Sequence, residues 1–377
     1  MSSEGVIGRI GGVESADEPT ESSTKKAGKT FMRYLTSSAG VALAIAAPAF
    51  GHHSDAALDM GSVVTFEGTV SEYSMRNPHT YFTVETRDER GERIEWTVQT
   101  ASAITVARRG WTPNTLSIGD QVKVGVHPAR DGRPYGLLES IEREGGAPVW
   151  EPFRGGPHQA EAVATVSTTT LEGRWIVDRL SLGDDYPGGL DQLMIRELAL
   201  TEKGKLAEAA YSQNAEENPE LACMTKPTPG GIIYTDLYPM EIEFIEDEQV
   251  VMIRSQYFDQ ERTVYMDGRG HPSADERTHE GHSIGRWEGG VLVVDTANFA
   301  DNRSPYQNGI PSGARKHVVE HYRLGEDGTR MTVEFMLEDP EYIVGTMTHR
   351  RDLIYSPQME MTPFNCDLEA TRRYLPR

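Results

Sequence analysis

The chain has 377 residues, a formal net charge of −21 at pH 7 and a hydrophobic content of 37%. So acidic a chain repels phosphate, which excludes nucleic acid as a partner. Its length suits two domains, at roughly 100–200 residues each. The 37 glycines and 21 prolines are frequent and spread out, which indicates many short strands joined by turns.

The N-terminal segment has the order of a secretory signal peptide. Basic residues precede an apolar run at residues 36–51, and a small-x-small cleavage site closes it. Because the run is shorter than the roughly 20 apolar residues of a membrane-spanning helix, we expect cleavage, a periplasmic or secreted protein and no stable membrane span. A membrane anchor is the alternative. The basic residues are Lys25, Lys26, Lys29 and Arg33, and the cleavage site is Ala49-Phe50-Gly51.

Residues 1–30 are polar and cannot bury a core. The natural start is therefore Met32, or the first segment is a disordered extension. The whole segment carries as many basic as acidic residues up to Gly51, so its removal leaves the net charge unchanged.

Five strands and one helix are predicted next, in the order three strands, helix, two strands. The first strand alternates apolar and polar residues, as a half-buried strand does. This order is typical of an OB-like small barrel, closed so that its strand edges are hidden. The predicted strands are 63–70, 80–86, 93–99, 121–126 and 136–141, and the helix is 102–109.

Motifs across this whole region resemble a domain of unknown function in many exported proteobacterial proteins. The resemblance implies export and a compact β domain, and it implies no activity. The motifs are His52-His53-Ser54, Gly68-Thr69-Val70, Asn77-Pro78-His79, Arg108-Arg109-Gly110-Trp111 and Gly119-Asp120-Gln121-Val122.

A strand at 175–178 and a run of eight further short antiparallel strands predict a larger up-and-down barrel or curved sheet. Gly173-Arg174-Trp175 at its start favours a lipocalin-like barrel that holds a ligand. The predicted strands are 175–178, 241–245, 249–253, 262–266, 283–287, 291–295, 317–322, 330–337 and 345–354, with a helix at 200–211. We divide the chain into a polar extension and signal peptide (1–51), an OB-like domain (52–145), a Gly- and Pro-rich linker (146–170) and an antiparallel barrel-like domain (171–377).

Residues 238–339 resemble a stretch widespread in uncharacterised exported bacterial proteins, and this resemblance also implies no activity. It is carried by the runs from Tyr265 to Pro272 and from Gly281 to Gly289. The second run fits the letters Gly-x-Ser-x-Gly of serine hydrolases. That motif needs a strand, a sharp turn and a helix, whereas Ser283 runs into a hairpin, so we do not expect a nucleophile there.

The densest polar group of the chain lies in the second domain. A histidine–carboxylate pair can transfer protons near neutral pH, and an adjacent arginine can hold a carboxylate or an oxyanion. His282 and Arg286 share strand parity, so both can point into one cavity. We predict a catalytic group of His282, Arg286, Asp295, His271, His317 and Glu320, with Tyr265, Arg269 and Trp287 binding the ligand. The alternative is a buried hydrogen-bond network that fixes the barrel.

Copper is the alternative to a cofactor-free site. After cleavage behind Gly51, His52 has a free α-amine beside its imidazole, and imidazole suits copper. His53 and His79 can add nitrogens. The two cysteines, Cys223 and Cys366, predict a disulfide in an oxidising compartment, and two unrelated buried thiols are the alternative.

The leading hypothesis is an exported enzyme or binding protein for a small molecule, with a ligand cavity in the second barrel. As an enzyme it performs cofactor-free acid–base chemistry, as a lyase, isomerase or hydrolase. A periplasmic copper protein and a structural or adhesive module are the alternatives.

Overall fold

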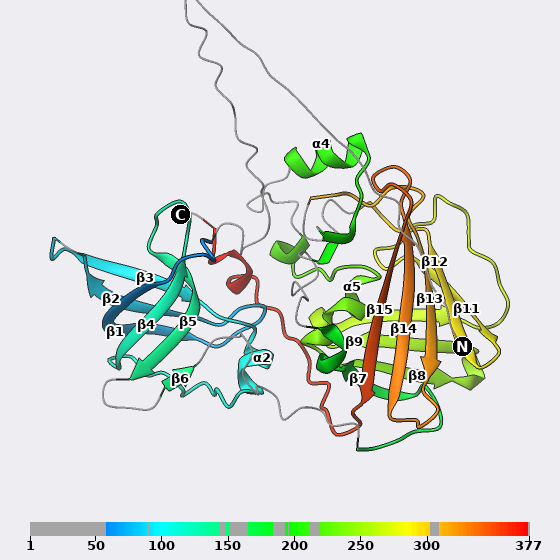
Figure 1. Cartoon of the computed structure of the whole chain (residues 1–377), viewed down its shortest axis with the longest axis horizontal. Helices are drawn as coiled ribbons and strands as arrows, with labels where there is room; N and C mark the ends of the chain where they lie inside the picture. Colours follow the sequence, from blue (N-terminus) through cyan, green and yellow to red (C-terminus); the bar gives the residue numbers. More distant parts are fainter. Residues whose placement is uncertain are drawn as a thin grey trace, which may run out of the picture. The chain divides into compact units, whose positions relative to one another are not determined.

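The structure is a computed structural model that describes residues 58–88, 90–143, 148–150, 165–183, 193–194, 196–210, 219–301 and 309–375. The fold is mostly β, as predicted: a small five-stranded barrel precedes a larger nine-stranded barrel (Figure 1). The predicted signal segment lies outside the described residues.

The first barrel has the strand order of an OB fold. β1 pairs with β2 and β4, β2 pairs with β3, β4 pairs with β5, and a parallel pairing of β3 with β5 closes the barrel. The short strand β6 extends the sheet beside β5. The strands are β1 Val64–Ser74, β2 Tyr81–Arg87, β3 Arg93–Gln99, β4 Gln121–Pro128, β5 Tyr135–Arg143 and β6 Pro148–Trp150.

Helix α2, Ala103–Ala107, separates the third strand from the fourth, where the sequence predicts it. The side chain of Ser102 accepts a hydrogen bond from the backbone N–H of Thr105, which caps the helix because the first turn has no partners of its own. The alternate residues Phe82, Val84 and Val98 are fully buried and form the barrel core with their neighbours.

The second barrel has nine strands, and each overlaps one of the nine strand ranges predicted from the sequence. Its order is β7 to β15, and β15 pairs with β7 to close it. The strands are β7 Gly173–Val177, β8 Met240–Ile245, β9 Val250–Ser255, β10 Gln260–Tyr265, β11 His282–Glu288, β12 Val291–Ala297, β13 His317–Leu324, β14 Arg330–Glu338 and β15 Thr346–Tyr355.

Short helices lie in the connections of this barrel and in the segment after β15. The α-helices are α4 Glu202–Ala210 and α5 Gly230–Ile233, and the 3-10 turns are η1 Arg179–Leu182, η2 Pro219–Ala222, η3 Tyr234–Asp236, η4 Glu246–Glu248, η5 Tyr257–Asp259 and η6 Ala370–Arg372. The hydroxyl of Thr201 accepts from the N–H of Gly204 at 3.1 Å, so Thr201 caps α4, which lies within the predicted helix at 200–211.

One pair of neighbouring strands in the second barrel is parallel. β10 and β11 run in the same direction, with Val264 opposite Ser283, while the other neighbours are antiparallel. Nine strands cannot all alternate in direction around a closed ring. The parallel pair is therefore a consequence of the strand number.

Alternate residues of each strand point into the barrel. Trp175, Val294 and Phe335 have no exposed surface and belong to one apolar core. Asp295, between two such positions on β12, is only partly buried and faces outward. This alternation decides which polar residues share a side of the wall.

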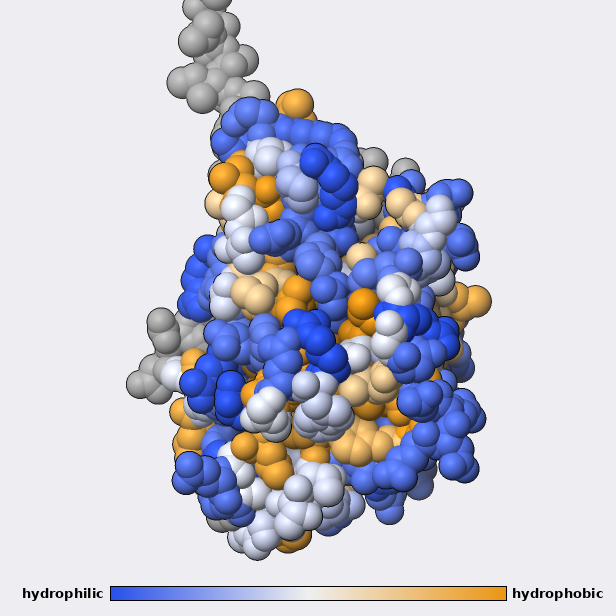
Figure 2. Space-filling view, turned by 90° about the vertical axis from the view of Figure 1, so that its right-hand side faces the viewer, coloured by the Kyte–Doolittle hydropathy of each residue, from blue (hydrophilic) through white to orange (hydrophobic). Residues whose placement is uncertain are grey.

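The surface of the molecule differs from this core in composition. In Figure 2 hydrophilic residues cover most of the drawn face, and hydrophobic residues form small patches between them. Among the residues that the structure describes, none of the helices combines the length and the apolar character that crossing a bilayer requires.

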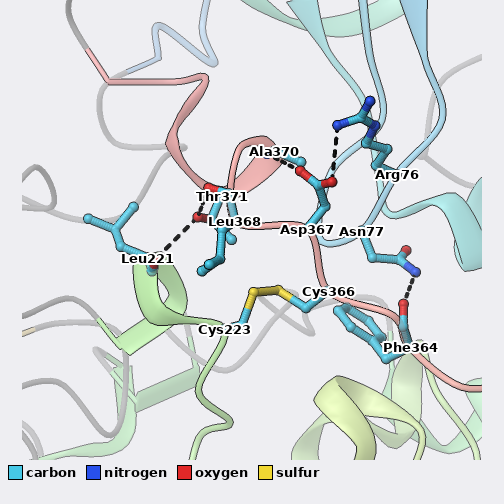
Figure 3. Close-up of a disulfide and its surroundings, with 10 residues drawn as sticks. All are labelled: Arg76, Asn77, Leu221, Cys223, Phe364, Cys366, Asp367, Leu368, Ala370 and Thr371. Atoms are coloured by element: carbon cyan, nitrogen blue, oxygen red, sulfur yellow. Dashed lines mark hydrogen bonds and ion pairs between the residues drawn. A yellow bond between two sulfur atoms is a disulfide. The ribbon is translucent and has the colours of Figure 1, made fainter.

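A disulfide fastens the C-terminal segment. Cys223 and Cys366 are bonded, as predicted, across a sequence separation of 143, with Cα atoms 5.9 Å apart (Figure 3). Beside the bond, the N–H of Asp367 donates to the carbonyl of Asn77 at 2.8 Å. Arg76 pairs with the Asp367 carboxylate at 3.0 Å. The segment that follows the second barrel therefore contacts the first.

Replacing both cysteines should weaken the fold, because a cross-link over so long a loop restricts the unfolded chain. We expect Cys223→Ser/Cys366→Ser to lose about 2–5 kcal/mol of the free energy of unfolding, measured by urea unfolding against the oxidised wild type. The reduced wild type is the matched control and should unfold with the variant. Equal stability of all three proteins would contradict the prediction.

Candidate functional site

The connection between β10 and β11, residues 266–281, lies on the outer wall of the second barrel. Parallel neighbours need such a crossover because the chain must return outside the sheet. The side chain of Asn298 donates to the carbonyl of Ser273 at 3.0 Å, and the N–H of Thr278 donates to the carbonyl of Asn298 at 3.1 Å. These contacts hold His271 against the outward residues of β11 and β12.

Two glycines of the Gly-His-Ser-Ile-Gly run allow this close packing. Gly281 has a φ of +75°, and a Cβ there would lie 2.7 Å from the carbonyl oxygen of Ala297. A Cβ on Gly285 would lie 2.5 Å from the sulfur of Met266. Ser283 points into the barrel and is 1% exposed. The run therefore forms a strand that leads into the hairpin of β11 and β12. This is the context in which we expect Ser283 not to be a nucleophile.

Four predicted site residues form one chain of hydrogen bonds on this wall. Nδ1 of His271 lies 3.0 Å from Nδ1 of His282, and Nε2 of His271 lies 3.0 Å from Oδ1 of Asp295. The same Asp295 oxygen lies 2.7 Å from Nε2 of His317. The four side chains come from the crossover and from β11, β12 and β13, which pair with one another in this order, so the pairing of these strands brings them together.

The charges of this chain follow from burial and hydrogen bonding. Burial acts to raise the pKa of Asp295, but the hydrogen bonds from His317 and His271 outweigh it and lower that pKa. The bond to Asp295 raises the pKa of His317. Burial lowers the pKa of His282, and the neighbouring His271 and Arg269 lower it further. At neutral pH Asp295 is therefore ionised and His282 is neutral.

Tyr265 and Arg269, two of the predicted ligand-binding residues, lie next to His282. The rings of Tyr265 and His282 stack with centroids 5.1 Å apart and planes inclined by 20°. The guanidinium of Arg269 lies 4.0 Å from the centroid of the Tyr265 ring. A base, an aromatic ring and a cation therefore share one patch of the wall.

Arg286 and Trp287 stand at the other end of β11. The prediction that His282 and Arg286 point into one barrel cavity is wrong, because Arg286 is exposed and pairs with Glu288 at 2.6 Å. Trp287 is 50% exposed and meets Phe244 edge-to-face at 5.9 Å. The sequence predicted correctly that Arg286 and His282 share one face of β11, but that face is the outer one.

Glu320 lies inside the barrel, on the opposite side of the wall from His317. It is fully buried, and its carboxylate oxygens lie 2.7 and 3.1 Å from the guanidinium nitrogens of Arg262. Arg262 also donates to the hydroxyl of Tyr322 at 3.1 Å. Burial raises the pKa of Glu320, and attraction to Arg262 opposes that rise. The structure therefore does not bring Glu320 to the histidines.

One small cavity lies beside this ion pair. Gln260, Arg262, Gly231 and Thr228 line a cavity of about 20 Å³, which is room for about one water molecule. Pockets for organic ligands are usually roughly 300–1,000 Å³. This cavity therefore does not suit the organic ligand that was predicted inside the barrel.

The copper site was predicted mostly on residues that the structure leaves out. His52 and His53 lie outside the described residues. Burial lowers the pKa of His79, and its Nδ1 has no hydrogen-bond partner within the described part of the chain. Across that same part, no three histidine, cysteine or acidic side chains are grouped so that they could hold a metal ion.

Comparison with known protein families gives a match that covers most of the first barrel. Residues 41–139 match a family described as a family of unknown function, DUF6152. The match ends within β5 and does not reach the second barrel. No curated protein matches the sequence. The first domain is thus similar to an uncharacterised family, and no activity follows from the comparison.

Sequence reasoning missed Arg262 and Tyr322, which hold the interior ion pair. The signal was available in strand parity, because Arg262 shares its face of β10 with the apolar Val264. A charge on an apolar face needs a buried partner, and Glu320 shares its face of β13 with Val318.

Removal of the interior carboxylate should destabilise the barrel, since it leaves the Arg262 charge buried without a counter-ion. We expect Glu320→Gln to lower the free energy of unfolding by about 3–5 kcal/mol, measured by urea unfolding. Glu334→Gln, on the exposed side of β14, is the control and should change it by less than about 0.5 kcal/mol. A Glu320→Gln protein as stable as the control would contradict the buried pair.

The Asp295–His317 pair should make stability depend on pH. The raised pKa of His317 gives stability that is present below about pH 6.5 and lost as pH rises through the raised value. The lowered pKa of Asp295 gives stability that is present above about pH 4 and lost as pH falls through the lowered value. His317→Gln should therefore be most destabilising between about pH 4 and 6.5.

Urea unfolding at several pH values measures this effect. His321→Gln is the control, because His321 shares the outward face of β13 and has no carboxylate partner in the part of the chain described. A loss of stability in His317→Gln that is the same at every pH would contradict the assignment.

Proposed function

We propose that the second barrel carries an acid–base site for a small organic molecule on its outer wall, with His282 as the general base. The reaction class is cofactor-free proton transfer, as in a lyase or an isomerase. The single observation that carries this proposal is the chain from Asp295 through His271 to His282. The sequence predicted a site inside the barrel, whereas the site proposed here lies on its outer wall.

The hydrogen bonds assign the protons of this chain. Ionised Asp295 can only accept, so Nε2 of His271 donates to it, and Nδ1 of His271 accepts the bond from His282. His282 then donates from Nδ1. Its Nε2 holds the lone pair, and no partner contacts Nε2 within the described residues. An imidazole with one nitrogen oriented and the other open is suited to accept a proton.

Electrostatics supports the same role. The lowered pKa of His282 keeps the base unprotonated at neutral pH, although it also limits the proton affinity of the base. When Nε2 takes a proton, the positive charge on the ring is stabilised through His271 by the Asp295 carboxylate. Stacking on Tyr265 fixes the plane of the imidazole.

Export belongs to the same proposal. The predicted signal segment supports it, and the Cys223–Cys366 bond supports it because disulfides persist in oxidising compartments. An exported protein meets its small molecules outside the cytoplasm. A cofactor-free site does not depend on a supply of soluble cofactor there.

Proton exchange tests the base directly. In D2O we expect the wild type to exchange the acidic C–H protons of at least one carbon acid, such as pyruvate, faster than buffer does. The C–H proton goes to Nε2 of His282, the electron pair stays on the substrate as an enolate, and a deuteron returns. His282→Gln should slow this exchange by about 10²–10⁴-fold, measured by proton NMR.

Chemical modification separates a lost base from a lost fold. Diethyl pyrocarbonate attacks neutral imidazole, so in wild type His282, with its lowered pKa, should react faster than His317, with its raised pKa, and the reaction of His282 should persist below about pH 6.5. Asp295→Asn should alter that pH profile, whereas His321→Gln should not. A folded His282→Gln protein with undiminished exchange would show that the hydrogen-bonded chain only fastens the crossover to the barrel.

A further inference from the structure

We infer that the molecule bound at this site is a small monocarboxylate, held by Arg269 beside the base. The inference deepens the proposed function and rests on it, because it names the class of substrate whose proton His282 would take. It is carried by the way in which an exposed arginine of the crossover is fixed beside the histidine.

Arg269 is held at three places. Its Nε lies 2.9 Å from both carboxylate oxygens of Asp267, its Nη2 lies 2.5 Å from Oδ2, and its own backbone N–H donates to Oδ1 at 3.1 Å. The guanidinium also covers the Tyr265 ring at 4.0 Å. The side chain is nonetheless 47% exposed. Ordering an exposed arginine costs side-chain entropy, so this arrangement is best understood as preparation of the guanidinium for a ligand.

The contacts leave one edge of the guanidinium open. Asp267 takes Nε and one side of Nη2, and no acceptor contacts Nη1 among the residues described. The N–H groups of Nη1 and Nη2 that remain form a fork, and such a fork matches the two oxygens of a carboxylate. The ligand class that fits this edge is therefore a planar carboxylate.

The fork of Arg269 lies near His282, the proposed base. Tyr265 contacts both Arg269 and His282, and the charge of Arg269 acts on the imidazole of His282. A carboxylate on the open fork brings the rest of the molecule to the patch that holds Nε2, and in pyruvate the acidic C–H bonds are those of the C3 methyl next to the ketone. Removal of a proton from C3 breaks a C–H bond, protonates Nε2 and leaves the electron pair on the substrate as an enolate, next to the positive guanidinium.

The surrounding charges favour a single negative charge on the ligand. Asp267 and Asp295 flank the patch, and both are ionised because their pKa values are lowered, that of Asp267 to about 2. The chain as a whole is also acidic, at −21. A phosphate dianion meets twice the repulsion of a carboxylate from each of these groups. A monocarboxylate keeps the attraction of the fork with the smaller penalty.

Histidine NMR of the full chain tests the inference. With pyruvate as the probe, the ring signals of His282 should shift and saturate, and inorganic phosphate and choline should give smaller shifts or none. Arg269→Met keeps the length of the side chain and should weaken pyruvate binding at least tenfold. Arg323→Met removes an exposed arginine from β13 and should bind pyruvate as the wild type does.

The outcomes separate this inference from the proposed function. Saturable binding that Arg269→Met weakens, without C–H exchange, supports the carboxylate site and overturns the base. Exchange that Arg269→Met leaves unchanged supports the base and overturns the inference. No saturable shift with pyruvate in folded wild type, or equal binding by Arg269→Met, also overturns it. Asp267→Asn, which releases Arg269 without removing its charge, should weaken binding less than Arg269→Met.

Discussion

The closure of an odd number of strands is the constraint on which both domains depend. A ring of five or nine strands cannot alternate in direction throughout, so each barrel contains a parallel pair, β3 with β5 and β10 with β11. In the first barrel α2 and β4 span the return. In the second barrel the return is the single connection 266–281, which lies outside the wall and pairs with few strand residues. The polar residues of the candidate site lie on that connection and on the strands beside it.

The wall beside the parallel pair is polar on both sides. β13 carries Glu320 inward and His317 outward. The neighbouring β12 carries Thr296 inward, against Arg262, and Asp295 outward, against His271 and His317. The buried Arg262–Glu320 ion pair joins β10 to β13 across the lumen, and breaking it would leave a charge buried without a partner. The outward side chains of β12 and β13 therefore extend from a wall that is also held together on its inner side. Such support suits a hydrogen-bonded chain in which Nε2 of His282 is left without a partner.

The strands themselves were readable from the sequence, because alternation of apolar and polar residues reports on a half-buried strand. The prediction for 93–99 coincides with β3, and the order of elements in the first barrel predicted its OB topology. The inward face of β11 was not readable. One face of β11 carries Ser283 and Gly285 and the other carries His282 and Arg286, so neither face is apolar enough to identify the core. The partner of His271 was also hidden, since it depends on a crossover that the strand pattern does not contain.

The first barrel contributes support more than a free binding surface. OB barrels often take ligands on the face of β2 and β3 and at the loop that follows β1. Here that loop holds Asn77, which pairs with Cys366 of the C-terminal segment, and the disulfide keeps this segment in place. On another side, Arg108 donates to the carbonyl of Leu237 at 2.6 Å, which continues the contact into the second barrel. A loop that is occupied by its own chain has little room for a ligand. The chemistry of the protein is therefore better sought on the exposed wall of the second barrel, where His282 keeps a nitrogen open.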